Sequence, residues 1–185
     1  MTGLFGGVFD PPHNGHLALA ETALRRFELD PLLVLVVGDP GHKGVALDAA
    51  NRVHLAQLAF GTLPRARILL EEHPRTVDAL RAHDFVDPLF LVGADEFAAF
   101  LSWKEPDGVL EEARMAVATR PGYPRERFEP VLAALQRPDR VEFFEIPPVD
   151  VSSTTVRERA CRGESVAGMV PDPVAREIEI AGLYR

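Results

Sequence analysis

Cysteine is nearly absent from this sequence, because Cys161 is the only one among 185 residues. A single cysteine excludes a disulfide within the chain and any zinc site built on several cysteines. Long apolar runs are also missing, since none approaches the ~18–20 residues of a membrane span. Residues 1–13 lack the basic segment and the apolar stretch of a signal peptide. These absences favour a cytoplasmic globular protein with no membrane partner.

Lysine is scarce as well. Only Lys43 and Lys104 occur among the 20 basic residues, and 28 acidic residues give a net charge of −8. The chain has no basic stripe of the kind that nucleic-acid surfaces need, so nucleic acid is not an expected partner. A few local donors can still bind a small anion on an acidic protein. The sequence leaves the oligomeric state open, with a homo-oligomer among the alternatives.

Apolar runs alternate with segments of helical periodicity, which indicates βαβ units. The predicted strands are Leu4–Phe9, Leu32–Val37, Ile68–Leu70, Leu89–Gly93, Met115–Thr119 and Val141–Ile146. The predicted helices are Gly15–Phe27, Ala49–Phe60, Val77–Ala82, Glu96–Trp103, Arg125–Leu135, Thr154–Arg162 and Pro173–Ala181, with Asp48 and Thr76 as N-caps. We therefore expect an α/β fold: one doubly wound, mostly parallel sheet with helices on both faces. Residues 1–185 are expected to form a single domain whose C-terminal helical part begins at about residue 152.

Polar segments follow the predicted strands, and in doubly wound sheets ligands bind beyond the carboxyl ends of the strands. These segments are expected to share one cleft. They are Asp10–His16, Asp39–Lys43, His73–Thr76, Ala94–Asp95, Arg120–Tyr123 and Val149–Thr154.

The first motif lies between the first strand and the first helix and reads Gly6-Gly7-Val8-Phe9-Asp10-Pro11-Pro12-His13-Asn14-Gly15-His16. Glycines let a backbone approach a ligand closely. A helix N-terminus with two imidazoles offers donors to phosphate charge. A Gly-Gly pair alone is more often a simple turn, and two histidines without a third ligand make a poor zinc site. The whole arrangement favours phosphate binding.

A second motif, Val151-Ser152-Ser153-Thr154-Thr155-Val156-Arg157, opens a later helix. Taken alone it is typical of an ordinary Ser/Thr N-cap followed by a solvated arginine. Together with the first motif, its hydroxyls and guanidinium indicate contacts with phosphate oxygens.

The two motifs resemble the nucleotidyltransferase superfamily, whose signature appears here as His13-Asn14-Gly15-His16 and Ser152-Ser153-Thr154 with Arg157. Further segments are similar to the bacterial nicotinate-nucleotide adenylyltransferases over roughly residues 3–184. Two positions depart from the pattern: Val8 stands where the family often has Ser or Thr, and Arg75 where it commonly has Tyr. The resemblance implies a Rossmann-like nucleotidyltransferase fold. It also implies an enzyme of NAD biosynthesis that transfers AMP from ATP to nicotinic acid mononucleotide.

The same resemblance implies roles for individual residues. The catalytic residues would be His13, His16 and Arg157. The ATP site would comprise Gly6, Gly7, Val8, Phe9, His13, His16, Gly93, Asp95, Val151, Ser152, Ser153, Thr154 and Arg157. The nicotinate mononucleotide would be bound by Lys43, Arg75, Thr76, Trp103, Lys104 and Arg120, although Trp103 could instead be a core aromatic. Mg²⁺ would be held mainly through substrate phosphates, with no protein ligand assigned.

Three alternatives remain open from the sequence. Phosphopantetheine adenylyltransferases share the signature, but they tend to be shorter and lack the context of Trp103 and of Arg120-Pro121-Gly122-Tyr123. A dinucleotide-binding redox protein would need Gly-x-Gly-x-x-Gly after the first strand, and that pattern is absent. A non-catalytic nucleotide sensor is disfavoured by the intact His13 and His16. The other four histidines, His42, His54, His73 and His83, are expected to be solvated or at helix ends.

Overall fold

The computed structural model describes residues 1–41 and 44–185, and its centre is one six-stranded sheet. Neighbouring strands are all parallel, in the order β3-β2-β1-β4-β5-β6. The strands are β1 (Thr2–Gly7), β2 (Leu32–Val37), β3 (Ala66–Glu71), β4 (Pro88–Gly93), β5 (Arg114–Thr119) and β6 (Val141–Glu145). The helices are α1 (Asn14–Arg26), α2 (Ala49–Phe60), α3 (Thr76–Ala82), α4 (Ala94–Ala98), α5 (Pro106–Glu112), α6 (Glu129–Ala134), α7 (Ser153–Cys161) and α8 (Asp172–Ile180).

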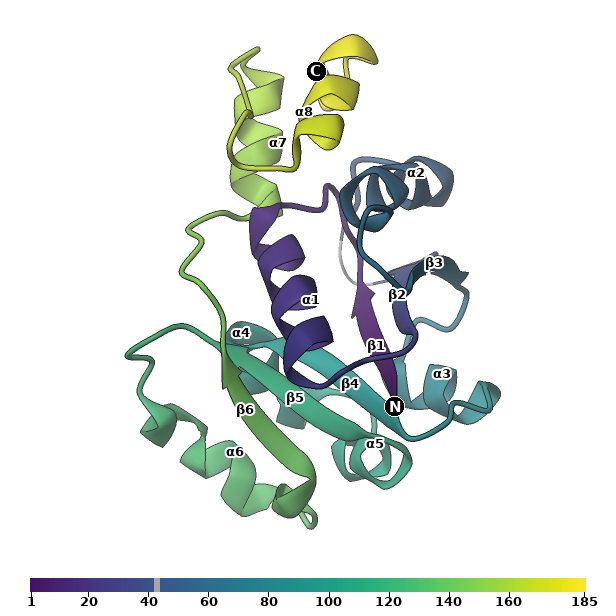
Figure 1. Ribbon diagram of the computed structural model, residues 1–185, viewed down its shortest axis with the longest axis vertical. Helices are drawn as coiled ribbons and strands as arrows, with labels where there is room; N and C mark the ends of the chain where they lie inside the picture. The colour runs from purple at the N-terminus through teal and green to yellow at the C-terminus, as the bar shows by residue number, and fades with distance from the viewer. Residues whose placement is uncertain (42–43) are drawn as a thin grey trace.

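Helices cover both faces of the sheet, as the sequence predicts (Figure 1). Alternate residues of a strand point to opposite faces. In β2, Leu32 and Val34 pack in a core with α1, α2, α7 and α8, whereas Leu33 and Leu35 pack in a second core with α3, α4, α5 and α6. A nearly continuous apolar run is what a parallel strand buried on both faces requires. The doubly wound α/β prediction is confirmed.

The strand order reverses between β1 and β4, which lie side by side at the centre of the sheet. Chain segments that follow these two strands run toward opposite edges. In such sheets the crevice outside the carboxyl ends at this point is where ligands bind. The loop 8–13 after β1 and the start of α4 after β4 both reach this position.

Some predicted element boundaries are confirmed and others are wrong. The bounds of α2 are as predicted, because the Asp48 side chain caps it by accepting a hydrogen bond from the Asn51 backbone N–H at 2.8 Å. Thr76 is not an N-cap: Arg75 occupies that position, and Thr76 is the first residue of α3. The predicted helix Glu96–Trp103 is divided into α4 and a short 3-10 helix, η1 (Phe100–Ser102).

Like the other strands, β6 ends at the carboxyl edge of the sheet. From there the chain continues to α7 and α8, which lie beyond the N-terminal end of α1 (Figure 1). Val156 of α7 and Val174 of α8 are fully buried in the same core as α1 and α2. Within the described ranges, none of the helices combines the length and apolar character needed to cross a membrane.

Candidate active site

His13 and His16 face each other at the start of α1. Their ring centroids are 3.7 Å apart and their planes differ by 18°. His13 is the N-cap, and its Nδ1 accepts a hydrogen bond from the His16 backbone N–H at 3.4 Å. In return, Nδ1 of His16 accepts from the His13 backbone N–H at 3.2 Å. The pair is thus a reciprocal capping box made of two imidazoles.

These hydrogen bonds determine which ring nitrogen of each histidine carries the proton. A neutral imidazole donates from one nitrogen and accepts at the other, so both rings carry hydrogen on Nε2. Burial lowers the pKa of His13 to about 4. Burial, and then the charge of His13, lowers the pKa of His16 well below its ordinary value. Both rings are therefore neutral at pH 7, and each has an Nε2–H that it can donate to an incoming anion.

Buried aromatic side chains support the histidine pair. Phe9, predicted to line the ATP site, lies in the left-handed region at φ 52° and is buried. Its ring meets His16 edge-on, with centroids 5.2 Å apart, and also packs against Phe5 and Phe60. A Cβ on Gly15 would lie 3.1 Å from the His13 ring, so a side chain there would require the ring to move by a few tenths of an ångström.

The start of α7 is hydrogen-bonded to the loop that precedes His13. The hydroxyl of Ser153 donates to the carbonyl of Pro11 at 2.8 Å, and the guanidinium of Arg157 donates to the carbonyl of Asp10 at 2.7 Å. Ser152 caps α7 by accepting from the backbone N–H of Thr155 at 3.1 Å. The two sequence motifs, about 140 residues apart in the chain, therefore form one structural unit.

Sequence reasoning assigned no role to Asp10, although it lies within the first motif. Its carboxylate is buried and accepts from the Tyr184 hydroxyl at 2.8 Å and from the Ala46 backbone N–H at 2.6 Å. Burial raises the pKa of Tyr184, and the neighbouring Asp10 raises it further, so the hydroxyl stays a donor. Asp10 thus ties the end of the chain and the segment before α2 to the histidine loop.

Arg52 is a second support that sequence reasoning missed. Its side chain is almost completely buried on α2. The guanidinium donates to the carbonyls of Val8, Val37 and Gly38 at 3.0, 2.6 and 2.6 Å, and its Nε donates to that of Leu47. A buried cation needs this degree of hydrogen bonding. Arg52 therefore joins the ends of β1 and β2 on the cleft side.

A cavity of about 400 Å³ lies between the starts of α3 and α4 and the residues after η1. Trp103 on its wall meets Phe90 and Phe100 edge-on, with centroids 6.1 and 5.3 Å away. Trp103 is therefore anchored in the core and also faces the cavity. Five residues that the sequence predicted for the site line this cavity: Arg75, Thr76, Asp95, Trp103 and Lys104.

Lys104 has a charged partner, and the other predicted residues lie away from the cavity or outside the described residues. Lys104 forms an ion pair with Asp78 at 2.7 Å. Arg120 starts an exposed turn after β5 and does not line the cavity. Lys43, like His42, lies outside the described residues. A Cβ at Gly93 would meet nothing within 4 Å, so the end of β4 faces open space.

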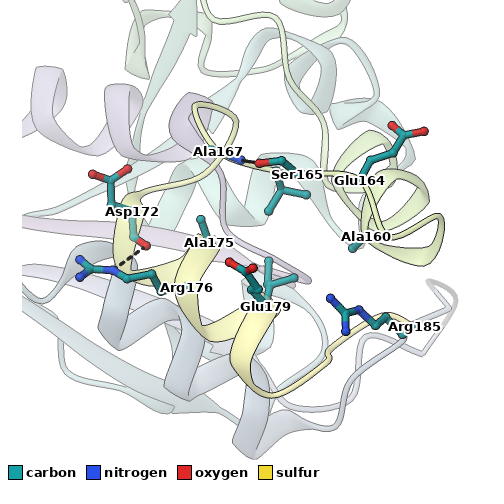
Figure 2. Close-up of a pocket in the computed structure, with 12 residues that line it drawn as sticks. Ala160, Glu164, Ser165, Ala167, Asp172, Ala175, Arg176, Glu179 and Arg185 are labelled. Atoms are coloured by element: carbon teal, nitrogen blue, oxygen red, sulfur yellow. Dashed lines mark hydrogen bonds between the residues drawn. The ribbon is translucent and has the colours of Figure 1, made fainter.

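A larger cavity, about 560 Å³, lies between the end of α7 and α8 (Figure 2). Its wall mixes acidic and basic side chains, among them Glu164, Glu179, Arg176 and Arg185, and Nε of Arg176 donates to the carbonyl of Asp172 at 3.4 Å. None of the residues that the sequence predicted for the site lines it. The larger cavity is therefore separate from the residues that the sequence predicted for the site.

The chain is similar to known proteins in both sequence and fold. The family model described as "Cytidylyltransferase-like" matches residues 4–159. Two relatives, both named "Probable nicotinate-nucleotide adenylyltransferase", come from Thermus thermophilus and Rubrobacter xylanophilus. They are 38% and 35% identical, with 99% of this chain covered in each case and 98% and 91% of the relatives.

A solved structure shares the fold. It is the Plasmodium falciparum nicotinic acid mononucleotide adenylyltransferase complexed with NaAD, which superposes with a TM-score of 0.77 at 16% identity, covering 99% of this chain and 96% of that one. The family model, the relatives and the histidine site agree: the chain belongs to the cytidylyltransferase-like family and, within it, to the nicotinate-nucleotide adenylyltransferases.

Proposed function

We propose that the protein transfers AMP from ATP to nicotinic acid mononucleotide, giving deamido-NAD and pyrophosphate. The observation that carries this proposal is the pair of neutral imidazoles at the start of α1, hydrogen-bonded through their loop to the start of α7. Relatives across the full length of the chain bear the name of this activity. The chain is therefore an enzyme of NAD biosynthesis.

The reaction needs no nucleophile from the protein. A phosphate oxygen of the mononucleotide attacks the α-phosphorus of ATP, and the bond from that phosphorus to the bridging oxygen of pyrophosphate breaks. Negative charge builds on the α-phosphate oxygens as this happens. The Nε2–H groups of His13 and His16 are donors for this charge, and donors fixed in advance cost no reorganisation during the reaction.

The outer phosphates of ATP are assigned to the start of α7. Ser152, Ser153 and Thr154 place hydroxyls and backbone N–H groups at a nine-residue helix whose N-terminus favours anions. Arg157 adds a positive charge one turn further along the same helix. Its bond to the Asp10 carbonyl fixes this charge beside the histidine loop. Gly93 and Asp95, at the end of β4, are assigned to the ribose of ATP.

The cavity beside Trp103 is assigned to the nicotinate mononucleotide. The indole gives the pyridine ring a stacking surface, and the backbone N–H groups of Thr76 and Lys104 are assigned to the carboxylate. Arg75 brings a guanidinium to the same wall, where the family commonly has Tyr. Lys43 and Arg120 remain candidates for the phosphate of the mononucleotide.

Magnesium fits this site as part of the substrate. Within the described ranges, the one group of three or more potential metal ligands is Glu71, His73 and His83. Two imidazoles in three ligands suit Mg²⁺ poorly, because it prefers oxygen and keeps several waters. We expect Mg²⁺ to enter on the phosphates of ATP, where it would neutralise charge. A cytoplasmic location and the lack of a nucleic-acid partner stay predictions from the sequence.

Acceptor choice tests the proposal. Pyrophosphate release is measured with MgATP and, in turn, nicotinic acid mononucleotide, nicotinamide mononucleotide and phosphopantetheine, with the adenylylated product identified by mass. We expect nicotinic acid mononucleotide to be used about a hundredfold better than its amide. The amide would lose a charge-assisted hydrogen bond of ~1.5–3 kcal/mol and leave unpaired an N–H that the bound ligand shields from water.

Each contrary result has a definite meaning. Equal kcat/KM for the two mononucleotides would show that stacking on Trp103 decides binding and that the carboxylate is not recognised. Release with phosphopantetheine alone would move the chain to the other adenylyltransferase class. No release with any acceptor would leave a nucleotide sensor.

A further inference from the structure

Glu71, His73 and His83 form a compact group outside the proposed nucleotide site. Glu71 ends the edge strand β3, His73 follows two residues later, and His83 follows the last residue of α3. Oε1 of Glu71 lies 2.7 Å from Nδ1 of His73, and Oε2 lies 3.1 Å from Nε2 of His83. All three potential ligand atoms lie within 4.8 Å of one another. From the sequence, both histidines were expected only to be solvated or at helix ends.

The group combines one buried carboxylate with two exposed imidazoles. The Glu71 side chain is only 6% exposed, whereas those of His73 and His83 are 41% and 46% exposed. Burial raises the pKa of Glu71, but the backbone N–H and ring of His73, together with His83, outweigh it and leave the pKa below its ordinary value. A buried carboxylate that stays charged therefore lies beneath two imidazoles that solvent can reach.

The three donors specify the kind of ion. We propose that Glu71, His73 and His83 bind a divalent transition-metal ion, with zinc as the best match. Zinc is held in proteins by imidazole nitrogen and carboxylate oxygen at ~2.0–2.2 Å, and two histidines with one glutamate are a known ligand set that leaves the fourth position to water. Ligands of a tetrahedral ion at these distances lie ~3.4 Å apart. The group reaches this spacing by small rotations of the two exposed rings.

The histidine pair of the nucleotide site lacks the ligand set of a zinc site. Nδ1 of His13 and Nδ1 of His16 are both occupied by backbone N–H groups, and no carboxylate is grouped with them among the described residues. In the group at β3, each histidine nitrogen that faces the centre instead meets an oxygen of the same carboxylate. The ion is therefore expected at β3 and not at the start of α1.

The site also has a consequence for the neighbouring cavity. Between Glu71 and α3 lies a segment of four residues, and Pro74 and Arg75 within it line the cavity together with Thr76. An ion on His73 and His83 would tie the beginning of this segment to the end of α3. We expect the bound ion to order the cavity wall without contacting a nucleotide.

Zinc titration of the intact, tag-free and chelator-treated chain tests the proposal. Calorimetry should show one saturable site per chain. His73→Ala and His83→Ala should each weaken binding by more than the ~10–100-fold that loss of an outer-shell partner costs. Circular dichroism checks that both variants fold. The matched control is His54→Ala, which removes another exposed histidine that pairs with a glutamate, Glu177, at 3.5 Å. This control should leave binding unchanged.

Hydrogen exchange gives a second readout that does not depend on activity. Zinc should slow amide exchange in residues 72–76 of the unmodified chain and should not do so in His83→Ala. Absence of saturable binding would overturn the proposal and leave a carboxylate that only accepts hydrogen bonds. Binding that survives His83→Ala but disappears in His16→Ala would also overturn it. Both results are independent of whether the chain adenylylates nicotinic acid mononucleotide.

Discussion

The side chains at the proposed reaction centre are held in fixed orientations by hydrogen bonds to backbone groups. Each imidazole of the His13–His16 pair accepts a backbone N–H, so its ring orientation and its donor nitrogen are fixed before substrate arrives. Fixed donors stabilise a transition state more than flexible ones, because the enzyme does not have to orient them during the reaction.

His16→Ala should therefore lower kcat by about 10²–10³, the usual effect of removing one such donor. The KM for ATP should change much less, because the bond to the α-phosphate is strongest in the transition state. Steady-state pyrophosphate release measures both values, with His54→Ala as the matched control on α2. A kcat within threefold of the unmodified chain would remove His16 from the mechanism.

The lowered pKa values of the two histidines also predict a pH dependence of stability. Both groups have a folded-state pKa below the ordinary value of 6.5, and that of His13 is about 4. Between these values the unfolded chain binds more protons, so stability falls as the pH drops through this window and is unaffected by these groups above it. The loss from about pH 7 to about pH 5 should be ~1–3 kcal/mol, allowing for the solvent that reaches the rings.

Urea unfolding at the two pH values measures this loss. The control is the double variant His13→Asn/His16→Asn, in which an asparagine still offers an N-cap acceptor. All other titratable groups, Glu71 among them, are present in both proteins and contribute equally to the pH dependence of their stability. An equal pH dependence in the two proteins would show that the histidines titrate normally in the folded state.

At the residue scale, the sequence indicates the groups that are proposed to touch substrate, but not their distant structural partners. The proposed contact groups belong to two short sequence motifs, one with His13 and His16 and the other with Ser153 and Arg157. Tyr184 is visible only as a residue near the end of the chain, because its partner is 174 positions away. Contacts over such distances leave no signal in one sequence read alone.

At the scale of the element, α7 joins an observed contact to a proposed one. Its first turn caps the helix and is assigned to the outer phosphates, while Arg157 also holds the histidine loop through the Asp10 carbonyl. The helix therefore links the position of the phosphates to the position of the donors. The two sequence motifs, although about 140 residues apart, are therefore parts of one structural unit.

Arg157→Ala should weaken ATP binding by about 10–100-fold, since a hydrogen bond from a charged group contributes ~1.5–3 kcal/mol. Binding of AMP, which lacks the outer phosphates, should change little. Calorimetry with both nucleotides measures the difference. The control is Arg159→Ala on the same helix, where the side chain instead contacts Glu164 and the Ser165 carbonyl. Equal losses for ATP and AMP would place Arg157 away from the outer phosphates.

Element boundaries were predictable where a local cause dominates. The bounds of β2 are confirmed because the whole strand is apolar, and those of α2 because Asp48 caps it. The edge strand β3 extends beyond the predicted Ile68–Leu70, because only its pairing with β2 makes Arg67 and Glu71 extended. The sequence did not predict α5, since its Pro106-Asp107-Gly108 start is also typical of a turn.

At the scale of the whole molecule, the last residues of the chain contact the loop that follows the first strand. β1 lies at the centre of the sheet, and the segment after α8 returns to the loop that follows β1. Asp10 is where they join, because its carboxylate accepts from Tyr184 while its carbonyl accepts from Arg157. The sheet supplies the crevice, and the C-terminal helices complete it.

Tyr184→Phe tests this closure with the loss of a single oxygen atom. Among the described residues, two groups donate to the buried Asp10 carboxylate, and the variant removes one of them. An unsatisfied buried partner costs ~1–3 kcal/mol of unfolding free energy. Because Asp10 belongs to the histidine loop, kcat should fall as well, while the folded chain keeps its secondary structure. Urea unfolding and pyrophosphate release measure the two effects. The control is Tyr123→Phe, the other tyrosine of the chain, whose ring stacks on Phe128 with centroids 5.3 Å apart.

Unchanged stability in Tyr184→Phe would mean that water replaces the hydroxyl. An unchanged kcat together with lower stability would mean that the C-terminus holds the fold together without positioning the histidines.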